Sequence, residues 1–116
     1  MNAPSRLIVS VLVAHVALPA TAAQENARGG WRATGDCFIA AFVLGDRGIA
    51  SVSYSNGAGA QRARWTWGNE GLNIISDTRG VLLMDGHYED TVLVAEVDYS
   101  TTDDVDFRTC RFTPTR

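Results

Sequence analysis

The stretch GGWRATGDC, residues 29–37, decides how this chain is expected to fold. It holds three glycines, a tryptophan and Cys37, which is one of only two cysteines in the sequence. The other cysteine, Cys110, lies close to the C-terminus. In an exported protein two cysteines pair by default. We therefore predict a Cys37–Cys110 disulfide that joins the first strand of the domain to the last.

Upstream of this stretch, the sequence has the three parts of a secretory signal peptide. Residues 1–6 carry a positive charge, residues 7–18 are apolar, and Ala20-Thr21-Ala22 is a small-x-small cleavage site. The apolar run is shorter than the roughly 20 residues that span a bilayer, which argues against a membrane anchor. We predict a cleaved signal peptide over 1–22, a flexible lead-in over 23–30 and a single domain over 31–116, which is periplasmic or secreted and has no membrane span.

Downstream, the chain consists of short segments rich in Val, Ile, Thr, Tyr and Trp, separated by turns that contain glycine. We expect the first strand over 31–43. Within residues 61–67, arginines and a threonine occupy one face of a strand, while an alanine, Trp65 and Trp67 occupy the other. This pattern is typical of all-β folds. We predict a small antiparallel meander β-barrel of about seven or eight strands, closed by the Cys37–Cys110 disulfide at the seam.

Three residues carry a resemblance to a known class of barrel. Gly29 and Trp31 form a Gly-x-Trp motif, and Arg111 lies on the last expected strand. The chain thereby resembles lipocalins and other calycin-type barrels, and in its size it is similar to small exported inhibitors of metalloproteases and c-type lysozymes. The resemblance implies that Arg111 packs over Trp31 and closes the base of the barrel. Its resemblance to the lysozyme inhibitors also implies a first-strand to last-strand cysteine pair, here Cys37 and Cys110.

The charge pattern narrows the class of partner. The formal net charge is −3, which argues against nucleic acid and anionic membranes. Carboxylates are dense in the C-terminal hairpin, where they would steer a basic protein such as a lysozyme, or would serve solubility alone. The candidate partner-binding residues are Asp103, Asp104, Asp106, Glu89 and Asp90.

Aromatic side chains supply an alternative function. Trp65, Trp67 and Tyr88 would either fill the barrel or line a cup for a small hydrophobic ligand. In a barrel this small the packed interior is the favoured interpretation.

Catalytic chemistry is the third hypothesis. His87 is the sole histidine beyond the expected signal peptide, no serine lies in a nucleophile elbow, and the cysteines are assigned to the disulfide. We therefore predict no catalytic residue, no metal site and no cofactor. The expected function is that of an exported, non-catalytic binding module, inhibitor-like and directed at a secreted or periplasmic enzyme.

Overall fold

The computed structural model describes residues 20–69 and 71–115 of the chain. Most of the predicted signal peptide, 1–22, lies outside the described residues. The described elements are one helix, α2 (Ala20–Ala27), a 3-10 turn, η1 (Asp46–Gly48), and the strands β1 (Gly29–Ala33), β2 (Ile39–Leu44), β3 (Ile49–Tyr54), β4 (Ala60–Gly68), β5 (Gly71–Ser76), β6 (Leu82–Glu89), β7 (Val92–Asp98) and β8 (Phe107–Pro114). No helix among the described residues is long and apolar enough to cross a membrane.

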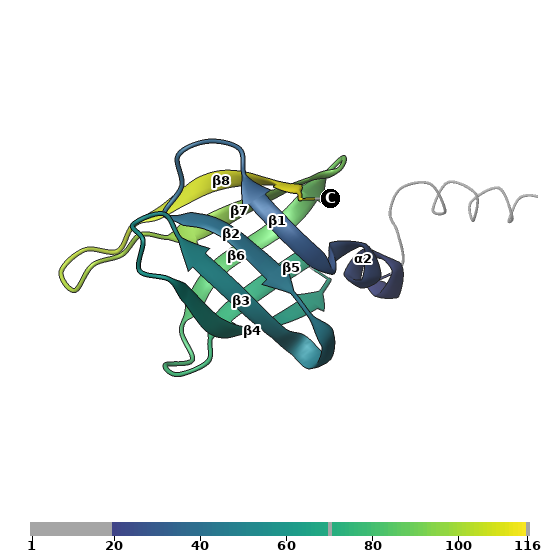
Figure 1. Cartoon of the computed structure of the whole chain (residues 1–116), viewed down its shortest axis with the longest axis horizontal. Helices are drawn as coiled ribbons and strands as arrows, with labels where there is room; N and C mark the ends of the chain where they lie inside the picture. Colours follow the sequence, from purple (N-terminus) through teal and green to yellow (C-terminus); the bar gives the residue numbers. More distant parts are fainter. Residues whose placement is uncertain (1–19, 70, 116) are drawn as a thin grey trace, which may run out of the picture.

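The strands form a closed antiparallel barrel in which each strand pairs with its neighbours in sequence (Figure 1). β1 closes the barrel by pairing with β8, with Trp31 opposite Pro114 and Ala33 opposite Phe112. Closure removes the two exposed edges that an open meander would leave. The prediction of an all-β meander barrel is confirmed, and the strand number is eight.

The first predicted strand, 31–43, is wrong as a single element. The chain reverses between β1 and β2, so that Trp31 pairs with Phe42 and Arg32 with Ala41. Both halves carry apolar residues, because β1 and β2 each send alternate side chains into the barrel. The reversal itself lies at Thr34, Gly35 and Asp36, which the prediction of one strand places inside that strand.

The predicted flexible lead-in, 23–30, is also corrected. Residues 20–27 form α2, and Gly29 and Gly30 already belong to β1. Ala27 is completely buried, and its carbonyl accepts a hydrogen bond of 2.7 Å from the indole Nε1 of Trp31. α2 also contacts β4 (Figure 1). One tryptophan thus holds the helix against an end of the barrel.

Aromatic rings pack through the centre of the barrel. Trp31 stacks on Phe42 with ring centroids 6.3 Å apart, and Phe42 meets Phe112 edge to face at 4.9 Å. These three side chains come from β1, β2 and β8, and none is more than 2% exposed. Three large aromatic side chains therefore fill the core at the seam where the barrel closes.

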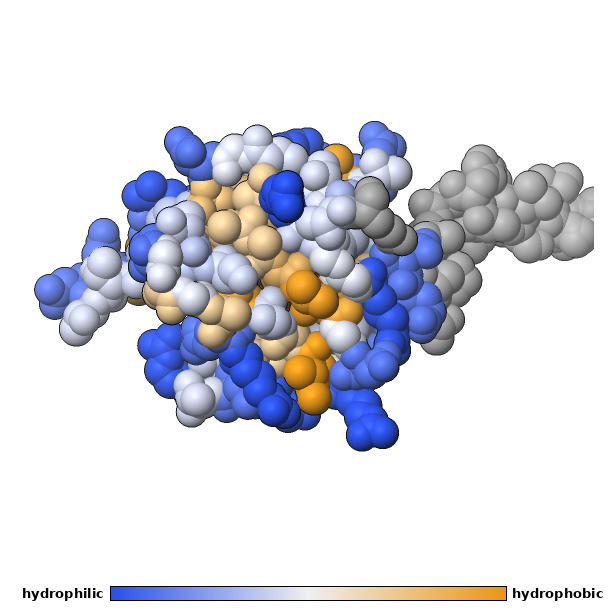
Figure 2. All heavy atoms as spheres, viewed as in Figure 1, coloured by the Kyte–Doolittle hydropathy of each residue, from blue (hydrophilic) through white to orange (hydrophobic). Residues whose placement is uncertain are grey.

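The outer surface of β1 to β3 is unusually apolar for a solvent-facing sheet. Figure 2 shows a pale to orange strip over these strands, bordered by hydrophilic side chains. Val43 and Ile49 are its largest exposed members, at 51% and 38%.

Candidate functional site

The disulfide fixes the geometry at one end of the seam. Cys37 and Cys110 are bonded, with Cα atoms 6.1 Å apart, and both are buried. Cys110 lies in β8, but Cys37 lies in the loop between β1 and β2 and not in the first strand. The pairing prediction is confirmed, and the bridge joins that loop to the last strand.

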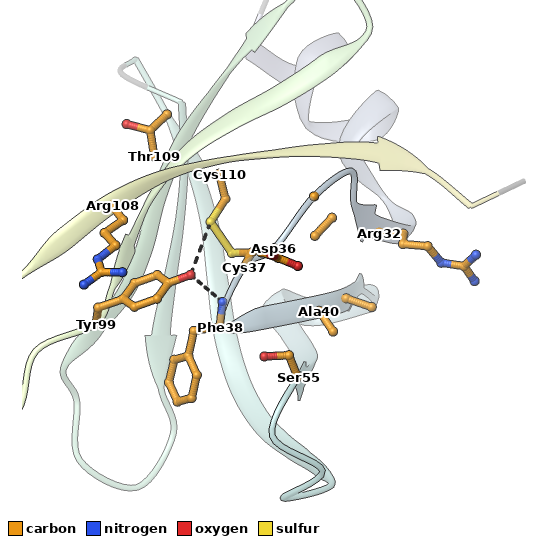
Figure 3. Close-up of a pocket in the computed structure, with 13 residues that line it drawn as sticks. Arg32, Asp36, Cys37, Phe38, Ala40, Ser55, Tyr99, Arg108, Thr109 and Cys110 are labelled. Carbon is orange, nitrogen blue, oxygen red and sulfur yellow. Dashed lines mark hydrogen bonds between the residues drawn. A yellow bond between two sulfur atoms is a disulfide. The ribbon is translucent and has the colours of Figure 1, made fainter.

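A surface hollow of about 720 Å³ opens beside the disulfide (Figure 3). Its lining includes the disulfide, Phe38, Ala40, Tyr99 and two arginines, Arg32 and Arg108. We call it the seam hollow. Its volume lies within the range of ligand and peptide sites, and it combines an apolar floor with charged groups at its rim.

Tyr99 organises the floor of the seam hollow. Its hydroxyl accepts a hydrogen bond of 2.6 Å from the backbone N–H of Phe38 and lies 4.0 Å from Sγ of Cys110. Its ring is 5.7 Å from the ring of Phe38. Tyr99 therefore pins the β1–β2 loop to the strand region that precedes β8 (Figure 3).

Arg108 connects this floor to the acidic residues. Its guanidinium lies 4.7 Å from the centroid of the Tyr99 ring and forms an ion pair of 2.9 Å with Asp106. Sequence reasoning missed Phe38, Tyr99 and Arg108. No local signal identifies them, because Phe38 and Tyr99 are 61 residues apart in the chain.

The loop between β7 and β8, residues 99–106, projects from the barrel and is called here the acidic loop (Figures 1 and 2). Asp103 and Asp104 are exposed, and Val105 between Asp104 and Asp106 is 82% exposed. Phe107, the first residue of β8, is 43% exposed. The loop therefore presents apolar and acidic groups together.

Hydrogen bonds give the acidic loop a defined shape. The N–H of Tyr99 donates to the carbonyl of Asp106 over 2.7 Å, and the N–H of Thr101 donates to that of Asp104 over 2.8 Å. Ser100 Oγ accepts from the N–H of Asp106 over 2.9 Å. These bonds cross the loop and hold its backbone in one arrangement.

The structure separates the acidic candidates into two groups. Glu89 and Asp90 lie at the turn between β6 and β7, at the opposite end of β7 from the acidic loop. Glu89 forms an ion pair of 3.2 Å with Arg111 and a hydrogen bond of 3.3 Å with His87. The five predicted residues therefore do not form one site, because the length of β7 stands between the two groups.

The predicted packing of Arg111 over Trp31 is wrong. Arg111 is exposed and lies between Cys110 and Phe112, whose side chains point inward. Strand alternation therefore directs the guanidinium outward, to Glu89. Arg111 does contribute to closure through its carbonyl, which accepts a 3.0 Å hydrogen bond from the N–H of Thr34. Gly29 and Trp31 lie in β1, as expected for residues that begin the barrel.

The predicted cup residues pack against neighbours. Trp65 is 3% exposed and donates through Nε1 to the carbonyl of Gly45 over 2.9 Å. Trp67 and Tyr88 are partly buried, with ring centroids 5.3 Å apart, and Tyr88 also meets Trp31 at 6.1 Å. Each of the three rings thus contacts another group of the protein.

Within residues 20–69 and 71–115, no group of three or more His, Cys, Asp or Glu side chains is arranged to hold a metal ion. No family model matches the chain, and neither a curated protein nor a solved structure matches it.

Proposed function

We propose that this chain is an exported, non-catalytic binding module that engages a basic secreted or periplasmic protein, in the manner of an enzyme inhibitor. The observation that carries the proposal is the acidic loop, which presents an 82% exposed valine beside carboxylates at the tip of a projecting hairpin. Export is supported by the disulfide, since such bonds persist in oxidising compartments.

The composition of the acidic loop suits recognition of a basic surface. Asp103 and Asp104 would accelerate encounter with a positive partner, because the attraction acts before contact. Val105 would then be buried on docking, which stabilises a complex by about 1 kcal/mol or more. The acidic loop would therefore raise the association rate through its carboxylates and lower the dissociation rate through Val105.

The internal hydrogen bonds of the acidic loop support the same proposal. A loop that is already ordered loses little conformational entropy on binding, so more of the contact energy appears as affinity. The three cross-loop bonds and the Asp106–Arg108 ion pair restrict it before any partner arrives.

The test measures association with basic exported enzymes, beginning with a c-type lysozyme as the probe. The double variant Asp103→Asn/Asp104→Asn should lower the association rate constant about tenfold at low ionic strength and flatten its salt dependence. Val105→Ser should instead raise the dissociation rate, by about five- to tenfold.

A matched control removes the same charge elsewhere. Asp85→Asn/Asp90→Asn alters two exposed carboxylates of β6 and the β6–β7 turn, away from the acidic loop. Asparagine tolerates the positive φ of 58° at position 90. An equal fall in rate for both double variants, or no fall for the loop variant, would overturn the proposal.

The alternative function, a lipocalin-like cup for a small hydrophobic ligand, has less support. Trp65, Trp67 and Tyr88 pack closely with other groups, which leaves less reason to expect a ligand among them. A catalytic function is the third hypothesis, and among residues 20–69 and 71–115 no assembled set of groups supports it.

A further inference from the structure

On the edge of β8 that faces β1, only part of the strand is paired. It pairs with β7 from Phe107 to Phe112, but with β1 only from Phe112 to Pro114. One further contact, from the N–H of Thr34 to the carbonyl of Arg111, extends the seam. Beyond it β1 has ended, and the first half of β8 faces the seam hollow instead of a strand.

The direction of the unpaired backbone groups follows from strand alternation. The carbonyl of Arg111 points to β1, whereas that of Asp106 points toward the β7 side, where it accepts from Tyr99. Successive residues of a strand direct their N–H and C=O groups to opposite edges. The main-chain groups of Phe107 and Thr109 therefore face away from β7, on the edge that lies toward the seam hollow.

No described residue of the chain satisfies these groups. If β1 continued in register, Asp36 would lie opposite Thr109 and Phe38 opposite Phe107. The loop leaves this path instead, and the N–H of Phe38 donates to the hydroxyl of Tyr99. Within residues 20–69 and 71–115, no residue hydrogen-bonds to the backbone of Phe107 or Thr109 on this edge.

The seam hollow has the chemistry to accept the side chains of an added strand. Its floor is the disulfide with Phe38 and Ala40, and Arg32 and Arg108 lie at opposite ends (Figure 3). Asp36 is the single carboxylate of its lining. Arg32 forms no ion pair with any described residue, so its charge is available to a carboxylate.

We propose that the open edge of β8 at Phe107 and Thr109 is a docking site for an extended peptide segment of a partner protein, in which apolar and acidic residues alternate. The segment adds a strand through main-chain hydrogen bonds to Phe107 and Thr109. Its apolar side chains enter the seam hollow, and a carboxylate meets Arg32. This site goes beyond the proposed function, because it binds the main-chain groups of a peptide and does not require the acidic loop.

Amide hydrogen exchange tests the open edge directly. In the oxidised protein, the N–H groups of Phe107 and Thr109 should exchange faster than those of Arg108 and Cys110, which face β7. Saturation with capped peptides of alternating glutamate and valine should slow exchange at Thr109 about tenfold, and lysine–valine peptides should have a smaller effect. Strong protection of Thr109 in the free protein would overturn the proposal, as would a panel without effect.

A proline substitution tests the same hydrogen bond by affinity. Thr109→Pro removes the outward N–H while leaving the bonds to β7 in place, and proline is tolerated at strand edges. It should weaken peptide binding about tenfold. Thr109→Val is the matched control, because it keeps the N–H and removes only the side-chain bond to Glu96. Equal affinities for the proline and valine variants would contradict strand addition.

One variant distinguishes failure of the strand-addition site from failure of the proposed function of the acidic loop. Asp103→Asn/Asp104→Asn should leave peptide affinity within about twofold of the parent, since the peptide bonds to the edge of β8. A loss of peptide binding equal to that caused by Thr109→Pro would show that the acidic loop, and not the edge, is the docking site.

Discussion

The pKa of Tyr54, the last residue of β3, is shifted by the surroundings of its side chain. Its hydroxyl donates a 3.0 Å hydrogen bond to Oε1 of Gln61, and its ring lies 4.9 Å from that of Phe38. Burial raises the pKa of Tyr54 above its ordinary value of 10.0, while Arg79 lowers it and Asp98 raises it by smaller amounts. The folded state therefore favours the protonated phenol.

This shift predicts a loss of stability at alkaline pH. Below about pH 10 the folded and unfolded states both keep the proton, so Tyr54 adds no pH dependence. Above it the unfolded state ionises first, and the free energy of unfolding falls as pH rises toward the folded pKa. Tyr54→Phe should lower stability by about 1 kcal/mol at neutral pH and flatten the alkaline decline. Urea unfolding from about pH 8 to about pH 11 measures both effects, and an unchanged decline in the variant would contradict this assignment.

At the scale of an element, the turn between β4 and β5 depends on a glycine. Gly71 has a φ of 109°, and a Cβ added there would lie 2.1 Å from the carbonyl oxygen of Gly86 in β6. The close approach arises because β5 pairs with β6 directly after the turn. No other residue fits both the backbone conformation and the space.

Gly71→Ala should therefore destabilise the fold by about 3 kcal/mol or more, because strain and a backbone clash add. Gly80→Ala is the matched control, since Gly80 also has a positive φ, 67°, but no atom within 4 Å of an added Cβ. It should cost about 1 kcal/mol. Chemical denaturation of both variants provides the comparison, and equal losses would mean that the clash at Gly86 is relieved by movement.

Element boundaries also show where sequence interpretation fails. The reversal between β1 and β2 lies at Thr34, Gly35 and Asp36, which separate the apolar residues on the two sides. The pairing of Trp31 with Phe42 depends on contacts across the barrel and not on the sequence between them. A boundary of this kind is set by register, which local periodicity does not encode.

For the whole molecule, the disulfide restrains the region where β1 no longer covers β8. It joins residues separated by 73 positions, so it removes many conformations from the unfolded chain. It also fixes the β1–β2 loop, which forms one wall of the seam hollow. Stability and the proposed peptide site are therefore coupled through one bond.

The double variant Cys37→Ala/Cys110→Ala should lower the free energy of unfolding by about 2–4 kcal/mol. Urea titrations of the parent and the variant, with and without a reductant, measure the difference. Reductant should shift the parent toward the variant and leave the variant unchanged. A variant as stable as the oxidised parent would show that strand pairing alone restrains the seam.

The sequence by itself determined the all-β meander, the pairing of its two cysteines and the inward face of β4, because alternation and cysteine count are local or countable properties. The acidic candidates were also identified from the sequence. Only the tertiary structure decided that Glu89 lies apart from Asp103, that Arg111 points away from Trp31, and that Tyr99 meets Phe38. These arrangements depend on how eight strands close on one another, since strand number and register together set which distant residues meet.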